Sequence, residues 1–100
     1  MSYKVLKDWR KGQMVSLVGY IDISYDRLVE KFGEPTEGDG YKVDAEWLLD
    51  IDGEFVTIYN YKDGVNYNGP EGTPVEDITD WHIGGATKGV EAKVRAIFEE

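Results

Sequence analysis

The chain reads YKVDAEWLLDIDGEFVTIYNYK from Tyr41 to Lys62. An Asp-Gly pair between two apolar segments is a strong signal for a β-hairpin with a two-residue turn. We therefore predict two antiparallel strands, Tyr41–Ile51 and Glu54–Lys62, joined at Asp52-Gly53. This pairing determines which side chains share a face of the sheet, and with it the rest of the fold.

Successive side chains of a strand point to opposite faces, so the predicted register divides the hairpin into two sets. The set expected to face the core pairs Leu49 with Val56, Trp47 with Ile58 and Ala45 with Asn60. The opposite set pairs Asp50 with Phe55, Leu48 with Thr57, Glu46 with Tyr59 and Asp44 with Tyr61. This second face is acidic and aromatic. A one-residue bulge would exchange part of the assignment.

Two further segments before the hairpin have clear patterns. Met14–Tyr20 is a short apolar run that predicts a strand. Ser24 is a good helix N-cap and Gly33 a good C-cap, and between them apolar residues recur at helical spacing. We predict a helix of about ten residues there.

After the hairpin, the segment 63–74 is rich in turn-forming residues and is predicted to be a loop. A last short strand contains Trp81 and Ile83, and Thr87 can cap a final helix. The predicted fold class is α+β, in the order β-α-β-β-β-α. It is an antiparallel sheet of about four strands with two helices packed on one face. We expect a single domain over residues 1–100, in which a basic segment (1–13) precedes the core (14–100).

The charge of the chain limits its partners. Among 100 residues, 20 are acidic and 11 are basic, which gives a net charge of −9. Between Glu34 and Asp80 there are thirteen acidic and only two basic side chains. Such a field repels nucleic acids and anionic membranes and attracts basic protein surfaces. We expect a partner protein with a basic surface, no direct nucleic-acid binding and no membrane binding. The alternative is that the acidity serves only solubility.

Candidates for chemistry are few. His82 is the only histidine, and Asp77 or Asp80 could orient it while a Ser or Thr hydroxyl acts as nucleophile. The sequence contains no cysteine, and the segment 50–54 resembles only half of a calcium loop, for which a hairpin turn is the preferred interpretation. We therefore predict a protein that is not an enzyme and has no metal and no cofactor.

Aromatic and amide side chains near the acidic strand positions form the predicted partner-binding surface. Such side chains are good anchors in protein interfaces. The predicted contact residues are Asp44, Glu46, Asp50, Phe55, Tyr59, Tyr61, Asn66, Tyr67 and Asn68. The alternative is that the tyrosines cover a second, partial core beneath the loop.

Three stretches resemble small proteins of tailed bacteriophages that have no assigned activity. They begin at Phe32, Thr57 and Ile78 and read FGEPTEGDGYKVDAEW, TIYNYKDGVNY and ITDWHIGG. The resemblance extends over roughly residues 20 to 85, and it implies a phage origin and action in the cytoplasm of the infected bacterium. Small acidic phage proteins include inhibitors of host defence, such as anti-CRISPR and anti-restriction proteins, many of which occlude a basic nucleic-acid site.

Three functions are consistent with these observations. The leading hypothesis is a phage-encoded inhibitor that binds a host defence or nucleic-acid-handling protein through the acidic, aromatic surface, as a mimic of nucleic acid. The first alternative is a small nucleotide- or metabolite-binding domain or enzyme that uses His82 and the Asn/Tyr-rich loop. The second is a phage structural or assembly subunit. Target, stoichiometry and a choice between monomer and homodimer stay open.

Overall fold

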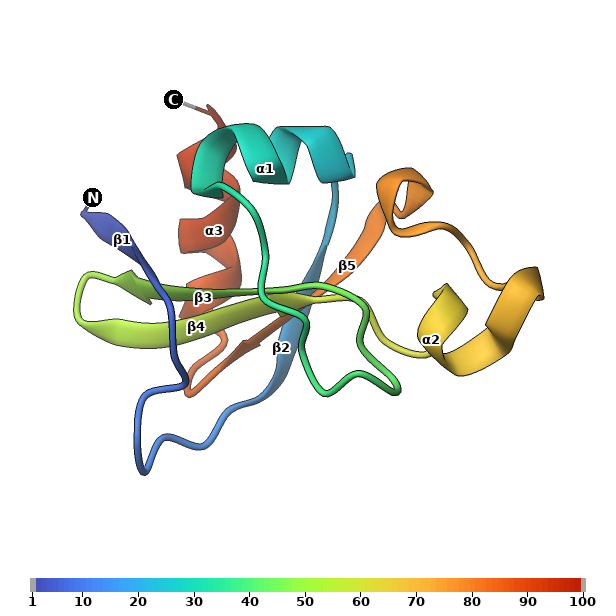
Figure 1. Ribbon diagram of the computed structural model, residues 1–100. Helices are drawn as coiled ribbons and strands as arrows, with labels where there is room; N and C mark the ends of the chain where they lie inside the picture. The colour runs from blue at the N-terminus through green and yellow to red at the C-terminus, as the bar shows by residue number, and fades with distance from the viewer. Residues whose placement is uncertain (1, 100) are drawn as a thin grey trace.

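The computed structural model describes residues 2–99 and contains one five-stranded antiparallel sheet (Figure 1). The strands are β1 (Tyr3–Leu6), β2 (Ser16–Asp22), β3 (Glu46–Ile51), β4 (Glu54–Tyr59) and β5 (Asp80–Gly85). Their order across the sheet is β1-β3-β4-β5-β2, so the hairpin β3-β4 lies in the middle. The predicted α+β class with an antiparallel sheet is confirmed.

The helical elements are α1 (Tyr25–Phe32), α2 (Val65–Asn68) and α3 (Gly89–Glu99), with two short 3-10 turns, η1 (Gly69–Glu71) and η2 (Val75–Asp77). Buried residues of α1 and α3 share one core with β3, β4 and β5. The structure therefore has five strands and three helices where four and two were predicted. The unexpected elements are the edge strand β1, in the basic segment, and the single turn α2, in the predicted loop.

The predicted register of the hairpin is confirmed. Six pairs run from Glu46 opposite Tyr59 to Ile51 opposite Glu54. The turn residues have positive φ angles, 53° at Asp52 and 90° at Gly53, as a two-residue type I′ turn requires.

Both hairpin strands are shorter than predicted, because hydrogen bonds to the side chain of Asn60 replace the backbone pairing at their ends. Asn60 is fully buried, and its Oδ1 accepts hydrogen bonds from the backbone N–H groups of Asp44 (2.7 Å) and Ala45 (3.1 Å). The chain therefore leaves the sheet beyond Tyr59 and before Glu46 without leaving those backbone donors unsatisfied.

Two tryptophans lie at the centre of the core. Trp47 and Trp81 are 1% and 0% exposed, and their rings meet edge to face with centroids 5.3 Å apart. Each indole N–H is satisfied by a backbone carbonyl, Gly33 for Trp47 (2.8 Å) and Ile23 for Trp81 (3.0 Å). The prediction that Trp47 faces the core is confirmed, and both tryptophans join the sheet to the segments that flank α1.

The predicted caps of α1 are present, but the predicted cap of the last helix is wrong. Ser24 Oγ accepts a hydrogen bond from the N–H of Arg27 (3.2 Å), and Gly33 has a φ of 84°. The hydroxyl of Thr87 instead donates to Glu54 Oε1 (3.5 Å), and α3 begins two residues later, at Gly89.

The outer edge of β2 is covered by side chains of α3. The backbone N–H of Tyr20 donates to Glu91 Oε2 (2.9 Å), and Arg95 Nη2 donates to the Tyr20 carbonyl (2.6 Å). Gly19 permits this approach, since a Cβ there would lie 2.2 Å from the Glu91 carboxylate.

The face of the sheet that points away from α1 and α3 is partly covered by two long connections. Residues 7–15 join β1 to β2, and residues 33–45 join α1 to β3. Figure 1 shows α1 above the sheet and the greater part of both connections below it. The space between these connections and the sheet is the site described next.

Candidate functional site

The second face of the sheet has two rows of side chains that run across the strands. One row contains Glu46 on β3, Tyr59 on β4, His82 on β5 and Tyr20 on β2. The neighbouring row contains Leu48, Thr57, Gly84 and Leu17 on the same four strands. Hairpin register and strand order together place Glu46 at the end of an aromatic row.

His82 is the centre of an aromatic cluster. Its ring contacts Tyr20 (centroids 5.0 Å apart), Tyr59 (5.4 Å) and Tyr61 (5.8 Å). Large side chains around this cluster remain accessible, with 41% to 48% of their surface exposed: Trp9, Leu17, Tyr20 and Tyr61. We call these four residues, together with Tyr59 and His82, the aromatic face.

The 7–15 connection covers one end of the second face. Trp9 packs edge to face on Phe55 with centroids 5.0 Å apart, and its indole N–H donates to the carbonyl of Gln13 (2.9 Å). The Arg10 guanidinium lies 5.8 Å from the centroid of the Phe55 ring. Phe55, a predicted contact residue, is therefore 3% exposed beneath this connection.

The 33–45 connection is held in shape by Asp39. Its Oδ1 accepts hydrogen bonds from the backbone N–H groups of Tyr41 (2.8 Å), Lys42 (2.9 Å) and Val43 (3.0 Å). These hydrogen bonds, first among them that from Tyr41, hold the pKa of Asp39 below its ordinary value. Asp39 thus keeps a negative charge beside the second face.

A pocket of about 420 Å³ lies between the two connections and the sheet. This volume is within the range of about 300–1,000 Å³ found for ligand sites. Its lining combines aromatic rings with two carboxylates: Trp9, Val15, Gly38, Asp39, Val43, Glu46, Thr57, Tyr59 and Tyr61. The pocket therefore lies beside the aromatic face and shares Trp9, Tyr59 and Tyr61 with it.

Two polar groups in this pocket are left unpaired by the protein itself. Glu46 is half-buried, and within residues 2–99 no hydrogen bond or ion pair reaches its side-chain oxygens. Burial, and then the charge of Asp39, raise the pKa of Glu46 to about 7. Thr57 Oγ1 is fully buried beside Gly84 and also lacks a partner in the described part of the chain.

The remaining titratable neighbour of Glu46 on the sheet is Tyr59, directly opposite on β4. Burial raises the pKa of Tyr59, and the carboxylate of Glu46 adds to the effect. A negative charge on the Glu46–Tyr59 pair is thus unfavourable in this pocket. A positively charged group in the pocket would relieve this.

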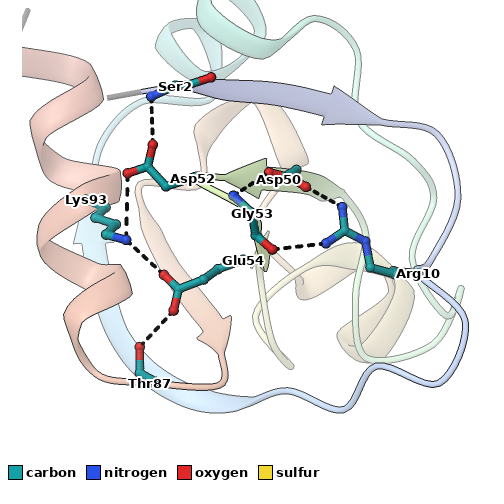
Figure 2. A network of polar contacts seen from close by, with 8 residues as sticks. All are labelled: Ser2, Arg10, Asp50, Asp52, Gly53, Glu54, Thr87 and Lys93. Atoms are coloured by element: carbon teal, nitrogen blue, oxygen red, sulfur yellow. Dashed lines mark hydrogen bonds and ion pairs between the residues drawn. The ribbon is translucent and has the colours of Figure 1, made fainter.

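The acidic residues at the hairpin turn are already neutralised, as Figure 2 shows for Asp50. Arg10 Nη2 forms an ion pair with Asp50 Oδ2, and Asp50 Oδ1 accepts a hydrogen bond from the Gly53 N–H (2.9 Å). The Arg10 side chain lowers the pKa of Asp50 more than any other contact. Asp50, a predicted contact residue, serves here to attach the 7–15 connection to the hairpin.

Lys93 of α3 neutralises the other end of the same turn (Figure 2). Its ammonium lies 3.0 Å from Glu54 Oε2 and 3.7 Å from Asp52 Oδ2. Asp52 Oδ1 also accepts a hydrogen bond from the backbone N–H of Ser2 (2.9 Å). Both ends of the described chain are therefore joined to the hairpin turn.

Three more predicted contact residues have structural roles at the other end of the hairpin. Asp44 accepts hydrogen bonds from Asn60 Nδ2 (2.8 Å) and from the backbone N–H of Asn66 (3.1 Å). The amide groups of Asn66 and Asn68 donate to backbone carbonyls at 2.9–3.4 Å. Tyr67 is 39% exposed and packs against Tyr41 outside the pocket. Of the nine predicted residues, the pocket brings together Glu46, Tyr59 and Tyr61.

Sequence reasoning missed the walls of the pocket. Trp9 belongs to a segment considered only for its charge, and Asp39 to a turn-rich stretch. The one available signal was an isolated tryptophan in a polar segment, since such a large aromatic ring usually finds a surface to cover.

His82 takes part in stacking, and among the described side chains it forms no hydrogen bond with Asp77 or Asp80. Residues 2–99 contain no group of three or more His, Asp or Glu side chains placed to bind a metal. None of the helices described is long and apolar enough to cross a membrane.

A further group of exposed acids lies around Tyr25, the first residue of α1. Burial, and then Glu34, Glu76 and Asp26, raise the pKa of Tyr25. We call the exposed acids of this group the acidic end, and they come from α1, the connection just after it, η2 and the paired ends of β2 and β5: Asp26, Glu34, Glu76, Asp77, Asp22 and Asp80. Within residues 2–99, none of these six acids forms an ion pair.

No protein-family model matches the chain, and neither a curated protein nor a solved structure is similar enough to match it. A functional assignment must therefore be argued from the geometry above.

Proposed function

We propose that this protein acts by binding another protein through the aromatic face. The observation that carries the proposal is the exposure of Trp9, Leu17, Tyr20 and Tyr61 beside a pocket, on the sheet face that the helices leave uncovered. Large exposed apolar groups that surround a concavity are typical of interaction sites, and aromatic residues dominate the energy of protein interfaces.

The charge of the chain supports a partner with a basic surface. The net charge is −9, and the carboxylates of the acidic end form no ion pair with a described lysine or arginine. Such charges accelerate the encounter with a basic partner and act less at high ionic strength. Their effect is on the association rate, whereas the aromatic face supplies contact area.

For the class of partner, we propose a host defence or nucleic-acid-handling protein that the chain inhibits. This part rests on the phage origin that we expect from the sequence and on the acidity of the chain. The hairpin acids Asp44 and Asp50 contribute little to it, because both are engaged within the chain. In this proposal, any resemblance to the charge of a nucleic acid depends on the acidic end.

A second candidate function, the binding of a small metabolite, is favoured by the pocket itself. Its volume of about 420 Å³ and its unpaired Glu46 carboxylate are features of small-ligand sites. The Asn/Tyr-rich loop contributes little to this candidate, since the amides of Asn66 and Asn68 are occupied by backbone carbonyls.

Two pairs of substitutions test the proposed function. Tagged protein is used to capture partners from a bacterial host, and a purified partner is then measured by binding kinetics. Leu17→Ala with Tyr20→Ala changes the aromatic face, whereas Val65→Ala with Tyr67→Ala removes comparably exposed side chains from α2, which lies in the loop between β4 and β5. Both double variants should retain the thermal unfolding midpoint of the unmodified protein.

We expect the face variant to bind roughly tenfold more weakly or worse, because truncating an anchor residue costs about 2 kcal/mol or more. The loop variant should bind as the unmodified protein does. Loss of binding by the loop variant alone would refute the proposal and transfer the contact surface to residues 63–76.

A further inference from the structure

We propose that the pocket beside the aromatic face accepts an arginine side chain of the partner, with its guanidinium held by Glu46 and Asp39 and its plane packed against Trp9, Tyr59 and Tyr61. This inference rests on the proposed function and specifies how the basic partner is recognised.

The charge of the pocket selects a cation. Asp39 stays ionised, because three backbone N–H groups bind its Oδ1. Glu46 provides a second carboxylate that no described side chain neutralises, although lysines and arginines neutralise Asp50 and Glu54 on the same two strands. A guanidinium carries five N–H donors and no acceptor, so it matches a site that offers carboxylate oxygens.

The aromatic lining of the pocket favours arginine over lysine. The walls include the rings of Trp9, Tyr59 and Tyr61. A planar, weakly hydrated guanidinium stacks on aromatic faces, whereas an ammonium is compact and strongly hydrated. The protein uses the same combination internally, where the Arg10 guanidinium lies over the Phe55 ring while it binds the Asp50 carboxylate.

Binding of arginine should depend on pH through Glu46. The charged or titratable groups nearest Glu46 are Asp39, with Lys42 beside it, and Tyr59 and Tyr61. Behind the two tyrosines lie His82, which contacts both rings, and Lys62, whose ammonium is 5.3 Å from the centroid of the Tyr61 ring. The 7–15 connection contributes Trp9 and Val15, which do not titrate. Since the pKa of Glu46 is about 7, this carboxyl is largely neutral at pH 6 and largely ionised at pH 8. Binding should therefore be tighter at pH 8.

The test uses small probes, so that it does not depend on knowing the partner. Nα-acetyl-arginine methylamide is titrated into the isotope-labelled protein, and the indole N–H of Trp9 and the amide of Gly38 are followed by NMR. The corresponding citrulline and lysine compounds are run in parallel, because citrulline has nearly the shape of arginine without its charge. The same titrations are made with Glu46→Gln and with the control Glu71→Gln, which removes an exposed acid outside the pocket.

We expect saturable shifts with the arginine probe, with a Kd on the order of 1 mM as befits a single side chain. The citrulline and lysine probes should bind at least about fivefold more weakly, and Glu46→Gln should lose both affinity and pH dependence while Glu71→Gln changes neither. Equal binding of citrulline, tighter binding of lysine, or unaltered binding by Glu46→Gln would each overturn the inference.

Failure of the arginine inference can be distinguished from failure of the proposed function. If the arginine probe fails while the Leu17 and Tyr20 variant still loses its partner, the aromatic face stands and the arginine assignment falls. If adenosine saturates the pocket and the arginine probe does not, the assignment also falls, in favour of the metabolite-binding candidate.

Discussion

Glu46→Gln should make the protein more stable at pH 8, because the unmodified fold keeps a carboxylate in the pocket without a partner. The folded-state pKa of Glu46 is raised from 4.5 to about 7. Each pKa unit corresponds to about 1.4 kcal/mol, so ionised Glu46 costs the fold about 3 kcal/mol above pH 7. The glutamine amide also lacks partners, at a cost of about 1 kcal/mol, which leaves a net gain of about 2 kcal/mol.

The sign of the pH dependence follows from the direction of the shift. Because the folded state binds the Glu46 proton more tightly than the unfolded state does, folding is favoured by acid at this position. Stability supplied by protonated Glu46 is present below about pH 4.5 and is lost as the pH rises to about 7. Between pH 5 and pH 8 this amounts to about 2 to 3 kcal/mol, and Glu46→Gln should abolish it.

Urea unfolding followed by tryptophan fluorescence, at pH 5 and pH 8, measures both proteins under the same conditions. Titration of every other group then cancels in the difference between them. Glu91→Gln is a control of opposite sign, since hydrogen bonding from the Tyr20 N–H lowers the pKa of Glu91. In the unmodified protein the ionised Glu91 carboxylate therefore stabilises the fold at pH 8, and this stabilisation is lost in acid.

If Glu46→Gln and the unmodified protein show the same change in unfolding free energy between pH 5 and pH 8, Glu46 is not buried as described. A positively charged partner would then relieve no unfavourable charge at Glu46.

Four further substitutions test the fold around the site. Trp47→Ala should lower the unfolding free energy by about 3 to 5 kcal/mol, measured by urea titration, because it empties the centre of the core; a loss under 1 kcal/mol would contradict the register of β3. Gly84→Ala should cost about 1 to 3 kcal/mol, since its Cβ would lie 2.5 Å from Thr57 Oγ1. Adding Thr57→Ala should restore most of that loss. If the two substitutions instead lower the unfolding free energy additively, residues 57 and 84 are not in contact. Arg10→Met should raise the pKa of Asp50, as followed by NMR, and should weaken the loss of stability in acid that this lowered pKa causes; an unchanged titration would mean that the ion pair is absent in solution.

Local signals in the sequence were sufficient for the centre of the fold. The Asp52-Gly53 turn predicted the register of the hairpin, and Ser24 and Gly33 predicted the ends of α1, because each acts through backbone geometry within a few residues. The strand β1 was not predictable in this way. It has only four residues, two of them exposed, and it exists through pairing with β3, distant in sequence.

The candidate site was predictable only in part, for a related reason. Alternation along β3 and β4 placed Glu46 and Tyr59 together on the second face. The walls come from connections without periodic sequence, and their positions depend on single contacts such as that of Trp9 with Phe55. Asp44 and Asp50 were predicted to contact a partner, but both bind side chains of the same protein. Their positions in the sequence gave no sign of these internal contacts.

The contacts of Glu91 and Arg95 with Tyr20 have a consequence for how this molecule can associate. A bare strand edge is a template on which a strand of another chain can add itself, and this is a common route both to peptide recognition and to aggregation. Here a carboxylate and a guanidinium occupy the N–H and the carbonyl through which such an incoming strand would pair at the middle of β2. Addition at this point would first have to remove two charged side chains from hydrogen bonds. Strand addition is thereby disfavoured at this edge of the sheet.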